Sequence, residues 1–496
     1  MAELIAAHGI TKVFPGVRAL DNVDFVLQPG EVHALVGENG AGKSTLIKIL
    51  MGAYRRDEGT LQIKGREIRE FNPQAAQAAG MAAVYQDISL ARSLSVGENF
   101  YLGRMPTTKW GTIDWTGANA RCGDLLKDLG LDIDPRVPLK SLPVAKQEMV
   151  AIAKPVFEGA DILVFDEPTA LLTNEETEIL FSIIRRLKSE GKGIIYISHR
   201  MEEIFAISDR VTVLKDGRHV KTLPVADTDA DELVRLMVGR SMADMYTIKR
   251  ATPGTTALRV EGLTREPRFR DINFDVRHGE IFGLFGLIGS GRTETIRAIF
   301  GADPIDSGKV YLHGKPTRFG HPSDAIAAGI GFMSEDRKNQ SIALPLSVRT
   351  NINLANYPAI SRFGIVDQAA EREAARSCIE RLQIKTPSDE VRIRNLSGGN
   401  QQKVVIGKNL TTKARILVCD EPTIGVDVGA KGEIYKVFES LTHDGVAILM
   451  VSSYLPEIMG LADRILVLYE GRQMGIVSRD EFDEERLIRL ASGLQA

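Results

Sequence analysis

The sequence predicts an α/β fold that occurs twice along one chain, and two observations support this prediction. Within each half, short β-rich runs alternate with helical patterns, which is typical of a mostly parallel sheet covered by helices. Three blocks of the first half recur in the second: 30–45 at 279–294, 160–173 at 414–427, and 208–218 at 462–472. Their offsets of 249, 254 and 254 residues indicate two homologous halves rather than a short-period repeat.

Local patterns place several elements of the first half. Residues 161–167 and 193–199 are continuous apolar runs, as expected of parallel strands that are covered on both faces. Thr173 and Glu176 have the spacing of a capping box, and Gly191 ends the helix that they begin. The predicted apolar face of this helix consists of Ile179, Leu180, Ile183, Ile184 and Leu187.

Length and composition limit the classes of protein that remain. A chain of 496 residues exceeds one ordinary hydrophobic core, so we expect a first domain at 1–245, a linker at 246–256 and a second domain at 257–496. The net charge of −3 provides no attraction to nucleic acid. No apolar run approaches the roughly 18 residues needed to cross a bilayer, and no signal peptide is recognisable, so a membrane role would need a partner. The three cysteines share no metal-ligand spacing.

The first half carries a phosphate-binding loop at Gly37–Ser44 with every required position intact. It follows an apolar strand and begins a helix, which is the context that the motif needs. Backbone N–H groups and the helix N-terminus would hold the phosphates, Lys43 would bind the β- and γ-phosphates, and Ser44 would ligate Mg²⁺. The alternative is a glycine-rich turn before an ordinary helix.

Two adjacent carboxylates strengthen the nucleotide interpretation. Asp166 ends a buried strand, where a carboxylate is costly unless it serves a cation, so it would support Mg²⁺. Glu167 is placed to polarise the attacking water as a general base. A solvated turn is the alternative, but the pair recurs as Asp420 and Glu421 in the second half.

The phosphate loop, "LSGGNQQ" at 396–402 and "ILVCDEP" at 416–422 together resemble the ATP-binding-cassette ATPases over essentially the whole chain. The resemblance implies two tandem P-loop NTPase cassettes, each with a mostly parallel sheet core, an antiparallel β part and a helical subdomain. In that family two cassettes meet head to tail, with ATP between the phosphate loop of one and the LSGG signature of the other.

Matching positions imply further roles in the first half. Gln86 resembles the residue that joins Mg²⁺ and water to the transport subunit, His199 the γ-phosphate sensor, and Phe14 the aromatic that stacks on adenine. Taken alone, each has an ordinary alternative: a surface glutamine, a structural cap and a core phenylalanine. The resemblance thus implies catalytic roles for Lys43, Gln86, Glu167 and His199, and Mg²⁺ ligation by Ser44, Gln86 and Asp166. The expected ATP contacts are Phe14, Gly37, Glu38, Asn39, Gly40, Ala41, Gly42, Lys43, Ser44 and Thr45, with Ser397, Gly398, Gly399 and Gln401.

The two halves are not equivalent, and their differences fall on one site. The first half reads "LPVAKQE" at 142–148 where the signature would stand, so Pro143 removes a hydroxyl and a backbone donor. Head-to-tail pairing therefore gives one intact site, built on Lys43 with Ser397, and one impaired site. The impaired site consists of Gly286, Gly289, Gly291, Arg292, Thr293, Glu335, Asp420, Glu421 and Ser453. Here Arg292 replaces the loop lysine, Glu335 replaces Gln86, and Ser453 replaces His199.

Finer motifs resemble one class within the family. "GRT" at 291–293, "EDRK" at 335–338 and "LSGGNQQKV" at 396–404 resemble the ATPases of bacterial monosaccharide importers of the ribose, galactose, arabinose and xylose class. This implies a chain peripheral to the cytoplasmic face of the inner membrane, working with two copies of a permease and a periplasmic sugar-binding protein. A nucleoside importer ATPase, a soluble tandem cassette acting on ribosomes or DNA, and a non-catalytic ATP switch are the alternatives.

Overall fold

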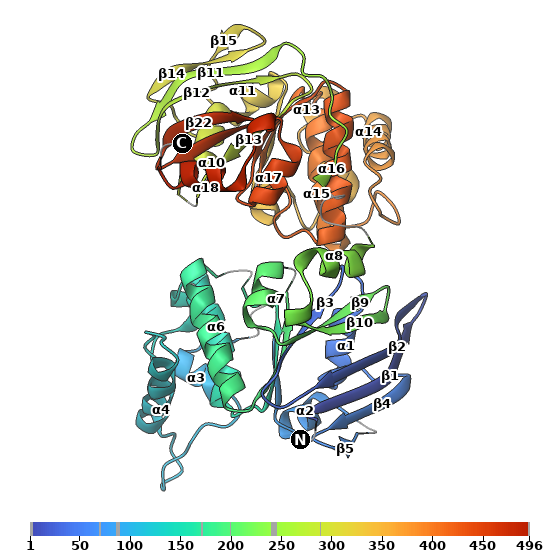
Figure 1. Ribbon diagram of the computed structural model, residues 1–496, viewed down its shortest axis with the longest axis vertical. Coiled ribbons are helices and arrows are strands. Elements are labelled where there is room, and N and C mark those ends of the chain that lie inside the picture. Colours follow the sequence, from blue (N-terminus) through green and yellow to red (C-terminus); the bar gives the residue numbers. More distant parts are fainter. Residues whose placement is uncertain are drawn as a thin grey trace. The chain divides into compact units, whose positions relative to one another are not determined.

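The computed structural model describes residues 3–68, 71–85, 90–169, 172–198, 200–239, 246–287 and 289–494, with Asn174 described by its backbone alone. The chain divides into two compact units, Met1–Ser241 and Met242–Ala496. Each unit contains strands and helices in alternation around its own sheet (Figure 1).

The first unit contains two sheets. Its antiparallel sheet has the order β2 (Val17–Leu27), β1 (Ile5–Phe14), β4 (Glu58–Ile63) and β5 (Arg66–Glu67). Its central sheet has the order β10 (Arg218–Pro224), β9 (Arg210–Lys215), β3 (Val32–Val36), β8 (Gly193–Ile197), β7 (Ile162–Asp166) and β6 (Met81–Val84). All neighbours in the central sheet are parallel except β9 and β10, so the carboxyl ends of β3, β7 and β8 meet at one edge.

The second unit repeats this plan, with its two sheets joined into one. Its strand order is β15 (Lys315–Thr317), β14 (Ser307–Leu312), β11 (Thr256–Arg265), β12 (Phe269–Arg277), β22 (Arg472–Ser478), β21 (Arg464–Tyr469), β13 (Ile281–Phe285), β20 (Ala447–Val451), β19 (Ile416–Asp420) and β16 (Ile330–Met333). The strands from β21 to β16 are parallel, whereas β11, β12, β14 and β15 form an antiparallel part. The predicted α/β fold with a mostly parallel core and an antiparallel part is confirmed.

Helices cover these sheets and form a separate layer beside them. Those of the first unit are α1 (Lys43–Leu50), α2 (Pro73–Ala78), α3 (Val96–Phe100), α4 (Trp115–Asp128), α5 (Val144–Phe157), α6 (Asn174–Ser189), α7 (Met201–Ile207) and α8 (Ala230–Val238). Those of the second unit are α10 (Arg292–Ile299), α11 (Pro322–Ala327), α12 (Val348–Asn353), α13 (Tyr357–Ile360), α14 (Gln368–Arg381), α15 (Gly398–Thr411), α16 (Val428–His443), α17 (Leu455–Leu461) and α18 (Glu484–Ala491). The helical subdomains are α3–α5 in the first unit and α12, α14 and α15 in the second, where the helices pack on one another.

The capped helix predicted after residue 173 is confirmed as α6. The Thr173 N–H donates to Glu176 Oε2 at 2.9 Å, and the Glu176 N–H donates to Thr173 Oγ1 at 3.3 Å, so both halves of the capping box form. The helix ends just before Gly191, whose φ of +82° suits a glycine. Of the predicted apolar face, Leu180, Ile183, Ile184 and Leu187 are buried and Ile179 is half-buried.

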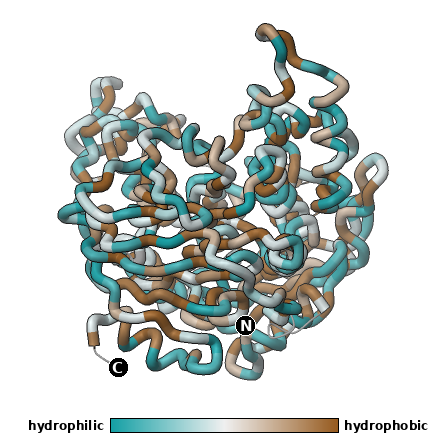
Figure 2. The backbone as a smooth tube through the Cα atoms, turned by 90° about the horizontal axis from the view of Figure 1, so that it is seen from above, coloured by the Kyte–Doolittle hydropathy of each residue, from teal (hydrophilic) through white to brown (hydrophobic). Residues whose placement is uncertain are grey.

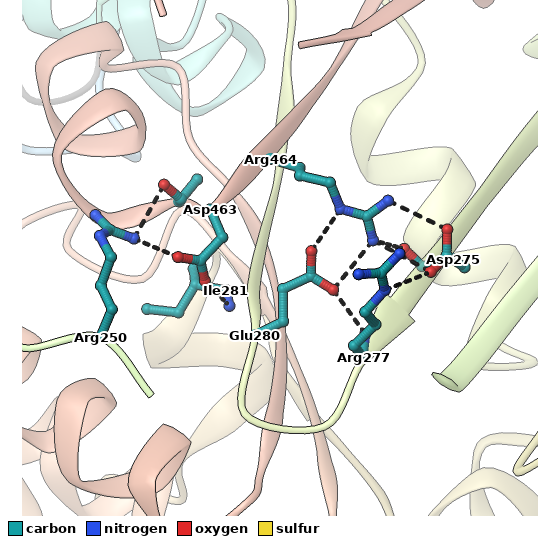
Figure 3. Close-up of polar contacts among 8 residues, drawn as sticks. Arg250, Asp275, Arg277, Glu280, Ile281, Asp463 and Arg464 are labelled. Atoms are coloured by element: carbon teal, nitrogen blue, oxygen red, sulfur yellow. Dashed lines mark hydrogen bonds and ion pairs between the residues drawn. The ribbon is translucent and has the colours of Figure 1, made fainter. Parts of the chain in front are cut away.

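The segment expected as a linker packs on the second unit. Arg250 donates to Asp463 Oδ1 at 2.6 Å, and the Ile281 N–H donates to Asp463 Oδ2 at 2.9 Å (Figure 3). Arg250 also donates to the Gly460 carbonyl at 2.7 Å. In the first unit the equivalent carboxylate, Asp209, accepts from Lys188 Nζ at 2.5 Å instead. Arg250 therefore supplies, from before the first strand of its unit, a cation that the first unit supplies from α6.

Hydrophobic and hydrophilic residues are interleaved along the whole backbone trace (Figure 2). In the described ranges, no helix has both the length and the apolar character that a membrane span requires. The apolar residues gather in cores on the faces of the sheets, one of which includes Phe25 and Leu46 in the first unit.

Candidate functional site

The loop of the first unit turns directly from β3 into α1, and packing explains two of its glycines. A Cβ on Gly37 would lie 2.4 Å from the Leu214 carbonyl oxygen, and one on Gly42 would lie 2.6 Å from Leu20 Cδ2. Gly42 also has a φ of +100° and caps α1 without a side-chain bond, so the first N–H groups of the helix receive no side-chain cap from it. This leaves backbone donors at a helix N-terminus, which is the arrangement that binds phosphate.

Lys43 lies over this loop. Its Nζ donates to the Gly37 carbonyl at 2.6 Å and to the Glu38 carbonyl at 3.0 Å. The ammonium group is therefore held beside the turn where the backbone donors converge. A phosphate entering the loop would meet both the donors and this point charge.

The carboxylate pair stands at the carboxyl end of β7. Burial raises the pKa of Asp166, Glu167 raises it further, and Lys43 and Lys48 oppose the rise. Glu167 has a left-handed φ of +52°, and its N–H donates to the Ile197 carbonyl of β8 at 2.9 Å. A non-glycine residue held in this conformation is strained by about 1–3 kcal/mol, and such strain is concentrated at functional sites.

A buried glutamate behind this pair was missed by the sequence analysis. Glu203 of α7 accepts from Thr169 Oγ1 at 2.7 Å, from Ser198 Oγ at 2.7 Å and from Tyr196 Oη at 2.9 Å. Thr169 lies two residues after Glu167, so the Glu203 carboxylate attaches the chain after the Asp166–Glu167 pair to the end of β8. The contacts span 34 residues of sequence, and no local motif signals them.

The same arrangement occurs in the second unit with one exchange. Glu457 accepts from Thr423 Oγ1 at 2.6 Å, from Ser452 Oγ at 2.5 Å and from Tyr435 Oη at 2.7 Å. In the first unit the tyrosine lies in β8, whereas in the second unit it lies in α16. The residue of β20 that corresponds to Tyr196 is Met450. The hydroxyl reaches the carboxylate from a different element in each unit, which indicates that the contact itself is what both units retain.

Two predicted residues of this site, Gln86 and His199, lie outside the residues that the structure describes. Phe14 is described: it ends β1, it is half-buried, and its ring meets Tyr54 edge to face at 5.4 Å between centroids. Lys12 Nζ lies 5.4 Å from the ring centroid. An aromatic ring is thus fixed at the tip of the β1–β2 hairpin.

The signature of the second unit begins α15. Ser397 is its N-cap, and its Oγ accepts from Asn400 Nδ2 at 2.9 Å. A Cβ on Gly398 would lie 2.9 Å from the Gly425 carbonyl oxygen, and one on Gly399 would lie 2.5 Å from Ala430 Cβ. The two glycines let the start of this helix press against the segment that leads into α16.

Gln401, expected among the ATP contacts, is buried within its own unit. Its Nε2 donates to the Leu396 carbonyl at 3.1 Å and to the Ile393 carbonyl at 3.3 Å. Only 7% of the residue is exposed, so this geometry supports a structural role in holding the turn before the signature.

The corresponding helix of the first unit, α5, begins differently. Pro143 is its N-cap and provides no side-chain bond. Glu148 stands where the second unit has Gln402; burial raises its pKa to about 7, and its Oε2 has no hydrogen-bond partner in the described part of the chain. This helix start therefore lacks the hydroxyl, the two glycines and the satisfied amide of α15.

The loop of the second unit keeps the shape of the first. Gly291 caps α10 with a φ of +89°, and a Cβ on Gly286 would lie 2.4 Å from the Leu468 carbonyl oxygen. Gly289, with a φ of +84°, has open space around it. The backbone could still receive a phosphate, but the side chains around it are arranged differently.

Arg292 lies against the second carboxylate pair. Its Nη1 is 3.7 Å from Glu421 Oε1, the same oxygen that accepts from the Ser453 N–H at 2.7 Å. Thr293 Oγ1 donates to Asp420 Oδ1 at 3.3 Å. Burial raises the pKa of Asp420 to about 6 and that of Glu421 to about 7. Glu335 is exposed and raises the pKa of Asp420 further.

These contacts disfavour Glu421 as a general base. One of its oxygens accepts from a backbone N–H and faces a guanidinium, so that oxygen is not available to an attacking water. The structure thus places Arg292, Thr293, Asp420, Glu421 and Ser453 together, as the sequence grouped them.

Comparison with known proteins gives a family model and many full-length relatives, two of which are described here. The model of the ABC transporter family matches residues 20–170 and 269–424, one stretch in each unit. A ribose import ATP-binding protein of Rubrobacter xylanophilus is 47% identical over 100% of this chain and 99% of that protein. One of Streptomyces avermitilis is 48% identical over 99% of this chain and 93% of that protein. A solved ATP-binding cassette of an ABC transporter, in its ADP conformation, covers 48% of this chain at 22% identity with a TM-score of 0.43.

Proposed function

The chain belongs to the ABC transporter family, and on that premise we propose that it hydrolyses ATP to drive import of a monosaccharide, with ribose as the first candidate. The different contacts of Lys43 and Arg292 support the mechanism that we propose, in which hydrolysis occurs at the first loop. Lys43 Nζ donates to two carbonyls of its own loop, whereas Arg292 Nη1 lies 3.7 Å from Glu421 Oε1, an oxygen that already accepts from a backbone N–H. The relatives' names, which state ribose import, support the substrate class.

ATP hydrolysis occurs at the site built on the first loop. Lys43 binds the β- and γ-phosphates, Glu167 polarises the attacking water, and Phe14 stacks on adenine. Gln86 and His199 complete this half of the site. In the head-to-tail pairing implied by the sequence, Ser397, Gly398 and Gly399 contribute the γ-phosphate contacts.

The donors present fit a magnesium ion that is held chiefly by nucleotide. In the described ranges, no group of three histidine, cysteine or acidic residues could hold a metal by itself. Mg²⁺ commonly uses one or two carboxylates with phosphates and waters, so Asp166 would supply the carboxylate, and Ser44 and Gln86 would supply further oxygens. In the second unit the matching pair, Thr293 and Asp420, are within hydrogen-bond distance, which supports this pairing of hydroxyl and carboxylate. When bound, the ion would offset the charge that develops on the transferred phosphoryl group.

The second loop binds nucleotide without efficient turnover. Its glycines keep the phosphate-binding backbone, and Arg292 keeps a cation there. The chain works at the cytoplasmic face of the inner membrane, beneath two permease subunits that receive sugar from a periplasmic binding protein.

Matched substitutions of the two glutamates test this proposal. Glu167→Gln should lower the ATPase rate of the full chain by about 10²–10⁴-fold, the usual range for a lost general base. Glu421→Gln should lower it far less, and Arg292→Lys alone should not restore turnover at the second site, because "LPVAK" would still face it. Equal losses in the two glutamine variants would refute the asymmetric model.

Uptake assays test the substrate. Vesicles that carry the chain with its permease and binding protein should accumulate labelled ribose when ATP is supplied, and Glu167→Gln should abolish uptake. Accumulation of a nucleoside and not of ribose would assign the chain to the nucleoside importers instead.

A further inference from the structure

Arg337 lies in the turn that follows Glu335 and contacts the start of the signature helix. Its Nη1 donates to the Gly398 carbonyl at 3.2 Å and to Gln402 Oε1 at 3.4 Å, and its Nη2 donates to the Gly425 carbonyl at 3.5 Å. One side chain thus joins three segments of the second unit: the π-helical turn Arg337–Ser341, the beginning of α15, and the loop before α16.

Among the residues that the structure describes, no carboxylate lies within ion-pair distance of Arg337, and its Nε is buried without a hydrogen-bond partner. Burial lowers the pKa of this guanidinium. The beginning of α15 is the positive end of a helix dipole, where another cation is unfavourable. A purely structural brace would cost less with a neutral donor, so the positive charge itself requires an explanation.

Further bonds make the same contact surface rigid. Gln402 Nε2 donates to the Pro422 carbonyl at 2.7 Å, and Lys408 Nζ donates to the Ser341 carbonyl at 2.8 Å. Both ends of the 337–341 turn are therefore attached to α15. A Cβ on Gly398 would lie 2.9 Å from the Gly425 carbonyl oxygen and 3.3 Å from Arg337 Nη2, so the signature has little room to shift on its own.

The first unit lacks the counterparts of this brace. Glu148 stands at the position of Gln402 (402 − 148 = 254), and its Oε2 has no hydrogen-bond partner in the described part of the chain. Ile88, which lies outside the described residues, stands at the position of Arg337 (337 − 88 = 249). The arginine and the satisfied glutamine therefore belong to the unit whose signature sequence is intact.

We propose that Arg337 is a positioning residue for the signature: it fixes Gly398 and adds positive charge beside the helix start that receives the ATP γ-phosphate. This inference rests on the proposed function, in which Ser397, Gly398 and Gly399 complete the site built on Lys43. Because Arg337 follows Glu335, whose position matches the glutamine that joins ATP to the transport subunit, the brace also links the permease-facing segment to the signature.

Kinetics of the full chain separate this role from simple packing. Arg337→Met should raise the ATP concentration for half-maximal hydrolysis by about tenfold, because a charge near the phosphate is lost in a partly desolvated site. The rate at saturating ATP should stay within about twofold, because the chemical groups remain. Arg337→Lys should recover part of the affinity. The matched control is Lys338→Met, which removes an exposed cation from the same turn and should leave the ATP dependence unchanged.

Gln402→Glu provides a second test that keeps Arg337 and its packing. The new carboxylate would neutralise the guanidinium, so the half-saturating ATP concentration should rise as in Arg337→Met. An unchanged ATP dependence in both variants, with only the saturating rate or the melting temperature lowered, would overturn the inference. If Glu167→Gln retains full activity, the proposed function itself fails. If Glu167→Gln is inactive and Arg337→Met hydrolyses normally, only this inference fails.

Discussion

Replacement of Glu421 by glutamine should stabilise the second unit at alkaline pH. Glutamine resembles the protonated carboxyl and keeps the oxygen that accepts from the Ser453 N–H. Burial raises the pKa of Glu421 from an ordinary 4.5 to about 7, even though Arg292 opposes the rise. Because the folded-state pKa is the higher one, folding favours the protonated form. The stability that this form contributes is present below pH 4.5 and is lost as the pH rises to about 7.

The size of the effect follows from the two pKa values. A difference between 4.5 and about 7 corresponds to roughly 3 kcal/mol at a pH above both values, at 1.36 kcal/mol for each pKa unit. For a unit of this size, 1 kcal/mol shifts the melting temperature by roughly 2–4 °C. Glu421→Gln should therefore melt several degrees above the parent chain at pH 8.5, and the two should converge near pH 4.5.

Differential scanning calorimetry of the nucleotide-free chain between pH 5 and 8.5 measures this difference directly. Glu433→Gln is the control of opposite sign: although burial raises the pKa of Glu433, Lys403 at 2.8 Å and Lys385 at 3.0 Å outweigh it and lower the pKa. That variant should be less stable than the parent chain at pH 8.5. A difference between Glu421→Gln and the parent that does not change with pH would refute the reasoning.

Two further predictions concern contacts that the structure revealed. Tyr435→Phe and Tyr196→Phe should each lower the free energy of unfolding of their own unit by about 1 kcal/mol, the typical net contribution of a hydrogen bond, as measured by urea denaturation. If only one of the two variants has a lower free energy of unfolding, the two tyrosines are not equivalent. Gly399→Ala should lower ATP hydrolysis by the full chain, because its Cβ would lie 2.5 Å from Ala430 Cβ and displace the signature. The matched change Ala145→Gly should not raise hydrolysis, because Pro143 remains.

Motifs confined to a few residues were readable from the sequence because local geometry decides them. The loop around Lys43, the capping box of Thr173 and Glu176, and the burial of β7 depend on neighbours in the chain. Glu203 was missed because its partners lie in two segments, Thr169 after β7 and Tyr196 with Ser198 at the end of β8, which meet only once β7, β8 and α7 are assembled. Arg337 lies inside the quoted "EDRK" motif, yet its partners are 61 to 88 residues away.

A contact of the predicted linker also could not be predicted from the sequence. Polar composition with glycine and proline predicts a connection between domains, and composition alone cannot show that Arg250 binds Asp463. In the first unit, the equivalent carboxylate of Asp209 accepts from Lys188 of α6. The residue of the second unit that corresponds to Lys188 is Thr442 in α16, which carries no charge. The second unit thus has no lysine at this position of α16, and Arg250 supplies the cation from before the first strand instead. Only the folded chain reveals this exchange.

The presence of Asp420 and Glu421 in the site that we propose to be impaired has a structural explanation. Asp420 accepts from Thr293 at 3.3 Å, which attaches the loop helix α10 to the end of β19. Glu421 accepts from the Ser453 N–H at 2.7 Å, which attaches the same strand end to β20. Thr423, two residues further on, donates to Glu457 and so fixes the segment that packs against Gly398. The pair therefore helps to hold the segment that packs against the signature, so on the proposed function its loss should lower hydrolysis at the site built on Lys43 even if the second site never hydrolyses ATP.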